Sequence, residues 1–221
     1  MSTGVDPAGA LYRAGLQKWE EHDPRRAFEL WEEGLRISPS DTRLLAVLTQ
    51  NLSNLGHHEE AVRYGTECVR LNPTDKVTHI WLADSLLELG RSEQAIAEYR
   101  IAGSILPWTG GPISGLAEAL RRAGRFEEAK AAYEEWFAHA PNNRERCVGY
   151  AAVLVELGEN METALEILRL VAGSPLGPRA KREEAKRILA RIEPSSGWTG
   201  AAQAGPLGLW EWWRSLRRGR R

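Results

Sequence analysis

Histidine is the residue type of this chain best suited to bind a metal or to act as a general base. Five histidines occur, and only two of them are adjacent: His22, His57, His58, His79 and His139. A metal site or a general base needs several polar groups that converge. No HExxH, CxxC or phosphate-loop spacing is present. The adjacent pair is interpreted as solvated side chains in a turn, His79 is interpreted as a core residue, and no metal or cofactor is predicted.

The segment GGPISGL, from Gly110 to Leu116, has some likeness to a turn that carries a nucleophilic serine. It lacks the Gly-x-Ser-x-Gly spacing, and it opens a predicted helix where the nucleophile turn would follow a strand. Because no other constellation of polar residues converges, the chain is predicted not to be an enzyme. The chemistry that remains is that of binding.

The strongest binding signal is the segment LWEWWRSLRRGRR, from residue 209 to residue 221. On a helix with 100° per residue, its Leu and Trp side chains gather on one face and Arg lies opposite. Trp combines an apolar body with an N–H donor, which suits surfaces that are apolar on one side and wet on the other. The residues predicted to dock are Leu209, Trp210, Trp212, Trp213, Arg214, Leu216, Arg217 and Arg218.

Charge is divided unevenly along the chain, whose formal net charge is −1. Residues 1–177 carry 18 Lys and Arg against 26 Asp and Glu, a net of −8, whereas residues 178–221 carry 11 against 4, a net of +7. The basic tail therefore has four candidate roles: docking to a protein, docking to a membrane surface, binding nucleic acid, or none. The acidic body disfavours nucleic acid. Protein and membrane surfaces are the partners that we predict.

A period of 34 residues organises the chain ahead of this tail. Pro recurs at 39, 73, 107 and 141, Ala at 27, 61, 95 and 129, and Gly at 56, 90, 124 and 158. Apolar residues recur at the spacing of amphipathic helices. The glycines predict a short turn inside each repeat, and the prolines end each second helix. Each repeat is therefore predicted to be a pair of antiparallel helices that approach closely at the small residues.

This pattern resembles the tetratricopeptide repeat family, in which the same small-residue, Ala, aromatic and Pro positions recur every 34 residues. The resemblance implies an all-α, right-handed superhelical solenoid of about five helix pairs. After a lead-in over residues 1–7, the predicted array covers 8–177, with repeats at 8–41, 42–75, 76–109, 110–143 and 144–177. The last repeat carries one extra residue near Asn160, which places its Ala at Ala164.

In this family the first helix of each repeat lines a concave groove that binds peptides or helices. By that resemblance, a partner would contact groove residues from the first three repeats. They are Tyr12, Arg13, Leu16, Trp19, Arg43, Val47, Gln50, Ile80, Trp81, Asp84 and Leu87. Aromatic residues and Arg are frequent anchors in protein interfaces. Trp19 and Trp81 have a second interpretation, which is packing between neighbouring repeats.

Residues 178–193 predict one further helix, with Ala, Ile and Leu on one face and Lys, Arg and Glu on the other. Such a helix caps a solenoid. Residues 194–208 are rich in Pro, Gly, Ser and Ala and are predicted to be a flexible linker, followed by the tail at 209–221. No membrane-spanning run and no secretory signal is visible, so we expect a cytoplasmic location, with peripheral attachment to a membrane as an open alternative. The predicted function is a non-catalytic adaptor or assembly scaffold. The alternative is a chaperone that shields an apolar segment during secretion or complex assembly.

Overall fold

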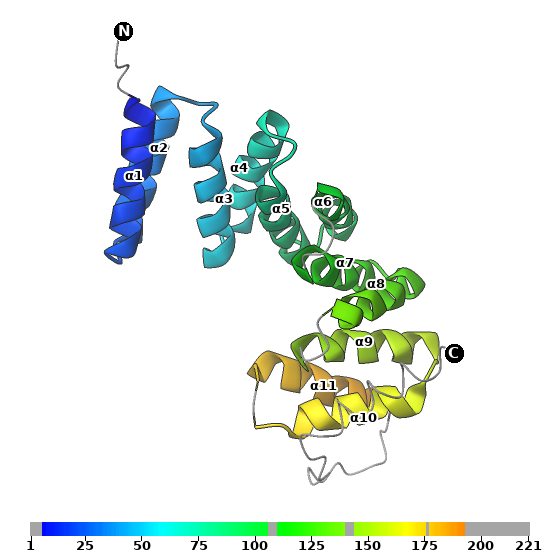
Figure 1. The fold of residues 1–221 in the computed structure, drawn as a ribbon. Coiled ribbons are helices and arrows are strands. Elements are labelled where there is room, and N and C mark those ends of the chain that lie inside the picture. The colour runs from blue at the N-terminus through cyan, green and yellow to red at the C-terminus, as the bar shows by residue number, and fades with distance from the viewer. Residues whose placement is uncertain (1–5, 106–109, 140–143, 176, 193–221) are drawn as a thin grey trace. The chain divides into compact units, whose positions relative to one another are not determined.

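A computed structural model describes residues 6–105, 110–139, 144–175 and 177–192 of the protein (Figure 1). These residues form helices and no strands, which confirms the all-α prediction. The helices are α1 (Pro7–Glu20), α2 (Pro24–Ile37), α3 (Thr42–Leu55), α4 (His58–Leu71), α5 (Lys76–Glu88), α6 (Ser92–Ile105), α7 (Gly110–Arg122), α8 (Phe126–His139), α9 (Arg144–Leu157), α10 (Met161–Gly173) and α11 (Arg179–Ile192). Each predicted repeat range contains one helix pair, while the repeat boundaries themselves stay a prediction.

The chain divides into two compact units, residues 1–115 and residues 116–221, and α7 begins in the first and ends in the second. In the first unit, α1 packs on α2, α3 on α4 and α5 on α6, and α5 also packs on α3 and α4. In the second unit, α8 packs on α9, α9 on α10, and α11 on both α9 and α10. Helix pairs stacked on their neighbours in this way bury apolar faces that no single pair could cover alone.

Aspartate side chains cap the N-termini of several of the described helices. Asp6 accepts a hydrogen bond from the Gly9 amide at 2.8 Å ahead of α1, and Asp23 accepts one from the Arg26 amide at 3.1 Å ahead of α2. Asp41 and Asp75 cap α3 and α5 in the same manner. These carboxylates satisfy amide donors that a helix N-terminus leaves without partners.

The glycines predicted to form the turn inside each repeat adopt the left-handed conformation. Their φ values are 83° at Gly56, 74° at Gly90, 74° at Gly124 and 67° at Gly158. In the first repeat the equivalent residue is His22, with φ 60°. The extra residue of the fifth repeat is accommodated at Asn160, which has φ 45° immediately before α10.

The recurring alanines lie at the centre of the packing. Ala27, Ala61, Ala95, Ala129 and Ala164 are all 0% exposed. Large side chains of the second helices are buried as well, and Trp31, Tyr99 and Tyr133 are among the largest fully buried residues. The small positions therefore let paired helices approach, as the sequence predicted.

The predicted capping segment contains α11, which packs on α9 and α10 through the buried Ala185 and Leu189. The linker at 194–208 and the tail at 209–221 lie outside the described residues. Among the residues that the structure describes, no helix has both the length and the apolar character needed to cross a bilayer.

Candidate protein-binding surface

The residues predicted to bind a partner lie on α1, α3 and α5, and they differ in exposure. Tyr12, Leu16, Trp19, Gln50, Ile80 and Trp81 are partly exposed, Arg13, Arg43 and Asp84 are exposed, and Val47 and Leu87 are buried. Buried Val47 belongs to the core cluster of the first two repeats. The two buried side chains can support this surface from within, and the remaining ones can reach a partner. We call these remaining residues the first-helix surface of unit 1.

Aromatic rings pack beneath the first-helix surface at α1. Trp19 meets Phe28 and Trp31 at ring-centroid distances of 6.0 Å each, and Phe28 meets Trp31 at 5.5 Å. The Trp31 indole donates to the Tyr12 carbonyl oxygen at 3.2 Å and covers Gly15 so closely that a Cβ there would lie 2.1 Å from Nε1. Trp19 thus packs inside its own repeat, not between neighbouring repeats in these ring contacts, and it stays partly exposed, so its contact with a partner remains a prediction.

Arg43 joins the beginnings of α1 and α3. Its guanidinium donates to Asp41 at 2.6 Å and to Asp6 at 3.0 Å, and it lies 6.0 Å from the centroid of the Tyr12 ring. The hydrogen bonds from Arg43 lower the pKa of the Asp41 carboxyl. The Arg43 and Asp6 side chains are about half exposed, so the main effect of these contacts is to fix the orientation of the arginine.

At α5 the surface is polar as well as apolar. The exposed carboxylate of Asp84 accepts a hydrogen bond from the Tyr99 hydroxyl of α6. The tyrosine ring lies against the start of α7, where a Cβ on Gly115 would be 2.3 Å from Tyr99 Cε1. Only glycine allows the ring this path to the carboxylate. Asp84 is therefore held in place beside the partly exposed Ile80 and Trp81.

The second unit repeats this arrangement with longer side chains. The Tyr133 hydroxyl of α8 donates to Glu118 of α7 at 2.9 Å, and a Cβ on Gly149 of α9 would lie 2.1 Å from that hydroxyl. We call this arrangement a Tyr–carboxylate unit. It consists of a carboxylate, a tyrosine fifteen residues later and a glycine in the next repeat. Neither copy was predicted from the sequence, although the spacing of fifteen residues and the following glycine were visible signals.

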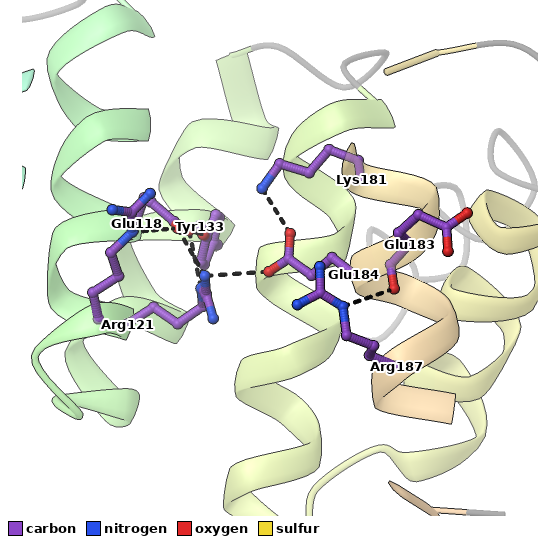
Figure 2. Close-up of polar contacts among 8 residues, drawn as sticks. Glu118, Arg121, Tyr133, Lys181, Glu183, Glu184 and Arg187 are labelled. Atoms are coloured by element: carbon purple, nitrogen blue, oxygen red, sulfur yellow. Dashed lines mark hydrogen bonds and ion pairs between the residues drawn. The ribbon is translucent and has the colours of Figure 1, made fainter. Parts of the chain in front are cut away.

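Figure 2 shows that Glu118 is the centre of a charged cluster that reaches α11. Glu118 accepts from Arg121 at 2.7 and 2.9 Å and from Arg122 at 3.1 Å. Arg121 also donates to Glu184 of α11 at 3.3 Å, and Lys181 pairs with the same carboxylate at 2.8 Å. In the second unit the carboxylate beside the tyrosine is thus tied by ion pairs to α11, while Tyr133 and Glu118 lie against Gly149.

The charge of Glu118 is set by two opposing effects. Burial disfavours the carboxylate and raises its pKa, whereas the hydrogen bonds and positive charge of Arg121, with further contributions from Lys181 and Arg122, lower it. The second effect is larger, and the pKa of Glu118 falls to about 2. Arg121 has a raised pKa for the same reason. The cluster is therefore ionised at neutral pH and held together by charge-assisted hydrogen bonds.

His79 is a core residue, as predicted. Its Nδ1 lies 2.6 Å from a Glu98 carboxylate oxygen, its Nε2 lies 3.1 Å from the Pro73 carbonyl oxygen, and the residue is buried. Both ring nitrogens thus face acceptors within the repeat. In the part of the chain that the structure describes, no group of three or more His, Cys, Asp and Glu side chains is placed to hold a metal ion. The predicted docking residues of the tail, from Leu209 to Arg218, fall outside that part.

Two protein families match parts of this chain. The bacterial transcriptional activator domain family matches residues 4–108, and the tetratricopeptide repeat family matches residues 114–135. No curated protein matches the chain.

Solved structures with a similar fold include tetratricopeptide and MamA proteins. The structure titled MamA 41-end from Desulfovibrio magneticus RS-1 is 17% identical, with a TM-score of 0.68, and the match covers 85% of this chain and 98% of that one. TTC0263, a thermophilic tetratricopeptide repeat protein of Thermus thermophilus, is 19% identical, with a TM-score of 0.58 and coverage of 82% and 98%. At these identities the likeness shows the fold alone.

Proposed function

We propose that this chain, which has the fold of tetratricopeptide-repeat proteins, is a non-catalytic adaptor that holds a protein partner on the first-helix surface of unit 1. Repeat proteins of this kind bind partners along the faces of stacked helices. The match of residues 4–108 to one domain family supports treating this part of the chain as one functional module.

The observation that carries the proposal is the set of fixed anchors on α1, α3 and α5. Trp19 is packed on Trp31, Arg43 is oriented by two carboxylates, and Asp84 is held by Tyr99. Each can contact a partner without first losing side-chain freedom, which reduces the cost of binding. Trp81 and Ile80 add partly exposed apolar area beside the Asp84 carboxylate. A peptide or helix with an apolar side chain next to a Lys or Arg fits this combination.

Unit 2 offers less room for a partner on its first helices. Arg121 and Lys181 both pair with Glu184 of α11, and Glu118 and Tyr133 lie against Gly149. A partner there would have to replace ion pairs that are partly buried, which is costly. We therefore assign partner binding to unit 1.

The tail at 209–221 is proposed to attach the adaptor to a second surface, either protein or membrane. The support is its sequence alone, five Arg and three Trp within thirteen residues. Two sites of modest affinity on one chain act together when a linker lets both bind at once. The tail would therefore raise the overall affinity of the adaptor wherever both of its partners are present.

The chaperone alternative has less support. A chaperone for an apolar segment needs a continuous exposed apolar strip. Among the described residues the large exposed hydrophobic side chains are scattered over four helices, at Ile37, Leu55, Val77 and Ile101. The fixed polar anchors beside Trp81 favour a specific partner.

A peptide library displayed on phage and selected on the full-length protein tests the proposal. We expect enriched peptides that pair an apolar residue with a basic one and that lose binding to Trp81→Ala and Asp84→Asn. The matched control is Arg100→Gln, an exposed position on α6. If no peptide is enriched, or if the enriched peptides bind the Trp81 and Asp84 variants as well as the wild type, the proposed surface is wrong.

A further inference from the structure

Basic side chains dominate the exposed side of α11. Between residues 179 and 192 the helix carries six Lys and Arg against two Glu, a net of +4. Ala185 and Leu189 are buried against α9 and α10, while Arg179, Arg187 and Arg191 are exposed on the other side. The remainder of the chain up to residue 177 has a net charge of −8, so α11 is a local reversal of sign.

Several of these positive charges form no ion pair within the described residues, although Arg179 and Arg182 act on the Glu183 carboxylate at longer range. Arg191 pairs with Glu156, and Lys186 pairs with Glu183 at 3.1 Å. Arg187 donates only to the Glu183 carbonyl oxygen, at 3.4 Å, and Arg182 donates to the carbonyl oxygens of loop residues ahead of α11. Neither these two arginines nor Arg179 forms an ion pair with a carboxylate of the described residues. The helix therefore presents guanidinium charge that can meet an external anion.

The chemistry of this face fits a lipid surface better than a protein. The exposed small residues between the charges are Ala180 and Ala190, and no aromatic or large aliphatic side chain lies among the exposed positions of the helix. A protein interface depends on a few such anchors at its centre. An anionic leaflet instead attracts the summed charge of nearby Lys and Arg, at about 1 kcal/mol for each residue. The planar guanidinium also matches the oxygens of a phosphate group.

We propose that the exposed side of α11 binds an anionic membrane surface, with Arg179 and Arg187 contacting lipid phosphates. The residues that follow in sequence favour the same partner, because the tail adds five Arg and three Trp, and Trp is enriched at membrane–water interfaces. This site is distinct from the first-helix surface of unit 1, and it does not require that surface to bind anything.

The test is co-sedimentation of the full-length protein with vesicles of phosphatidylcholine alone or mixed with equal parts of phosphatidylglycerol. We expect binding to the anionic vesicles only, with release at high salt. The double variant Arg179→Gln/Arg187→Gln removes two charges and should weaken binding about thirty-fold. Its control, Arg25→Gln/Arg36→Gln, makes the same change of net charge at exposed positions of α2 and should bind like the wild type.

Three results would overturn the proposal. The first is equal binding by the α11 variant and the wild type. The second is equal binding to neutral and anionic vesicles. The third is that soluble poly-glutamate binds the protein while anionic vesicles do not, which would identify an acidic protein as the partner of this face. The variant Trp212→Ala/Trp213→Ala, measured in parallel, separates the tail from α11, because loss in that variant alone assigns the binding to the tail. Circular dichroism of each variant checks that the helices are retained.

Discussion

The environment of Glu118 strongly favours its charged form, and that charge should stabilise the fold. Its pKa lies at about 2 in the folded protein, against an ordinary value of 4.5. The folded state therefore binds fewer protons, and the stabilisation is present above pH 4.5 and is lost as the pH falls toward 2. The difference corresponds to about 3 kcal/mol.

The variant Glu118→Gln tests this linkage. At pH 7 we expect the free energy of unfolding to fall by about 3 kcal/mol or more, because Arg121 loses a buried carboxylate. The gap between variant and wild type should shrink between pH 5 and pH 2 in denaturant titrations. Glu127→Gln, an exposed position on α8, is the control. A gap that stays constant over this pH range would show that the charge of Glu118 is not the source of the stabilisation.

His22 occupies a position where the later repeats have glycine. Its φ of 60° is costly for a residue with a Cβ. His22→Gly is therefore expected to raise the free energy of unfolding by about 0.5–1 kcal/mol, offset in part by the greater freedom of glycine in the unfolded chain. Chemical denaturation measures the change. A decrease would mean that the histidine side chain makes a stabilising contact that outweighs its backbone strain.

At the scale of elements, the close approach of paired helices depends on alanine. Ala95 on α6 is 0% exposed, so Ala95→Trp should overpack the helix pair and lower the free energy of unfolding by about 1–3 kcal/mol or more. Ala97 is two residues away on the same helix and is exposed, so Ala97→Trp should change stability by less than about 0.5 kcal/mol. Thermal and denaturant unfolding of the pair gives the comparison, and similar losses in both variants would contradict the packing argument.

The sequence predicted this level of structure well, for a physical reason. Proline, alanine and glycine act locally: each restricts or frees its own backbone, so their 34-residue spacing revealed helix pairs, turns and the insertion at Asn160. The Tyr–carboxylate units were missed because they join three helices, and no single helix shows them. The burial of Val47 and Leu87 was missed because family positions alone do not distinguish a side chain that faces a partner from one that turns into the core.

For the whole molecule, a repeat array implies that the effect of a destabilising substitution stays local. Each helix pair is stabilised mainly by its neighbours, so a destabilised repeat opens without unfolding distant ones. In hydrogen exchange, Ala95→Trp should speed exchange in α4, α5 and α6 of unit 1, and α9 to α11 should keep rates near those of the wild type. Equal acceleration in all helices would show instead that the chain unfolds as one cooperative block.

The glycine that lies against the tyrosine of each Tyr–carboxylate unit also limits how such an array can grow by gene duplication. A tandem copy of residues 110–143 would place a second Gly115 after Tyr133, and the new junction would reproduce the contact between Tyr133 and Gly149. A tandem copy of residues 76–109 would place Trp81 where Tyr99 now meets Gly115, and the two rings would collide. The fourth repeat can thus follow a copy of itself. The third repeat can be followed only by a repeat that has glycine at the position of Gly115.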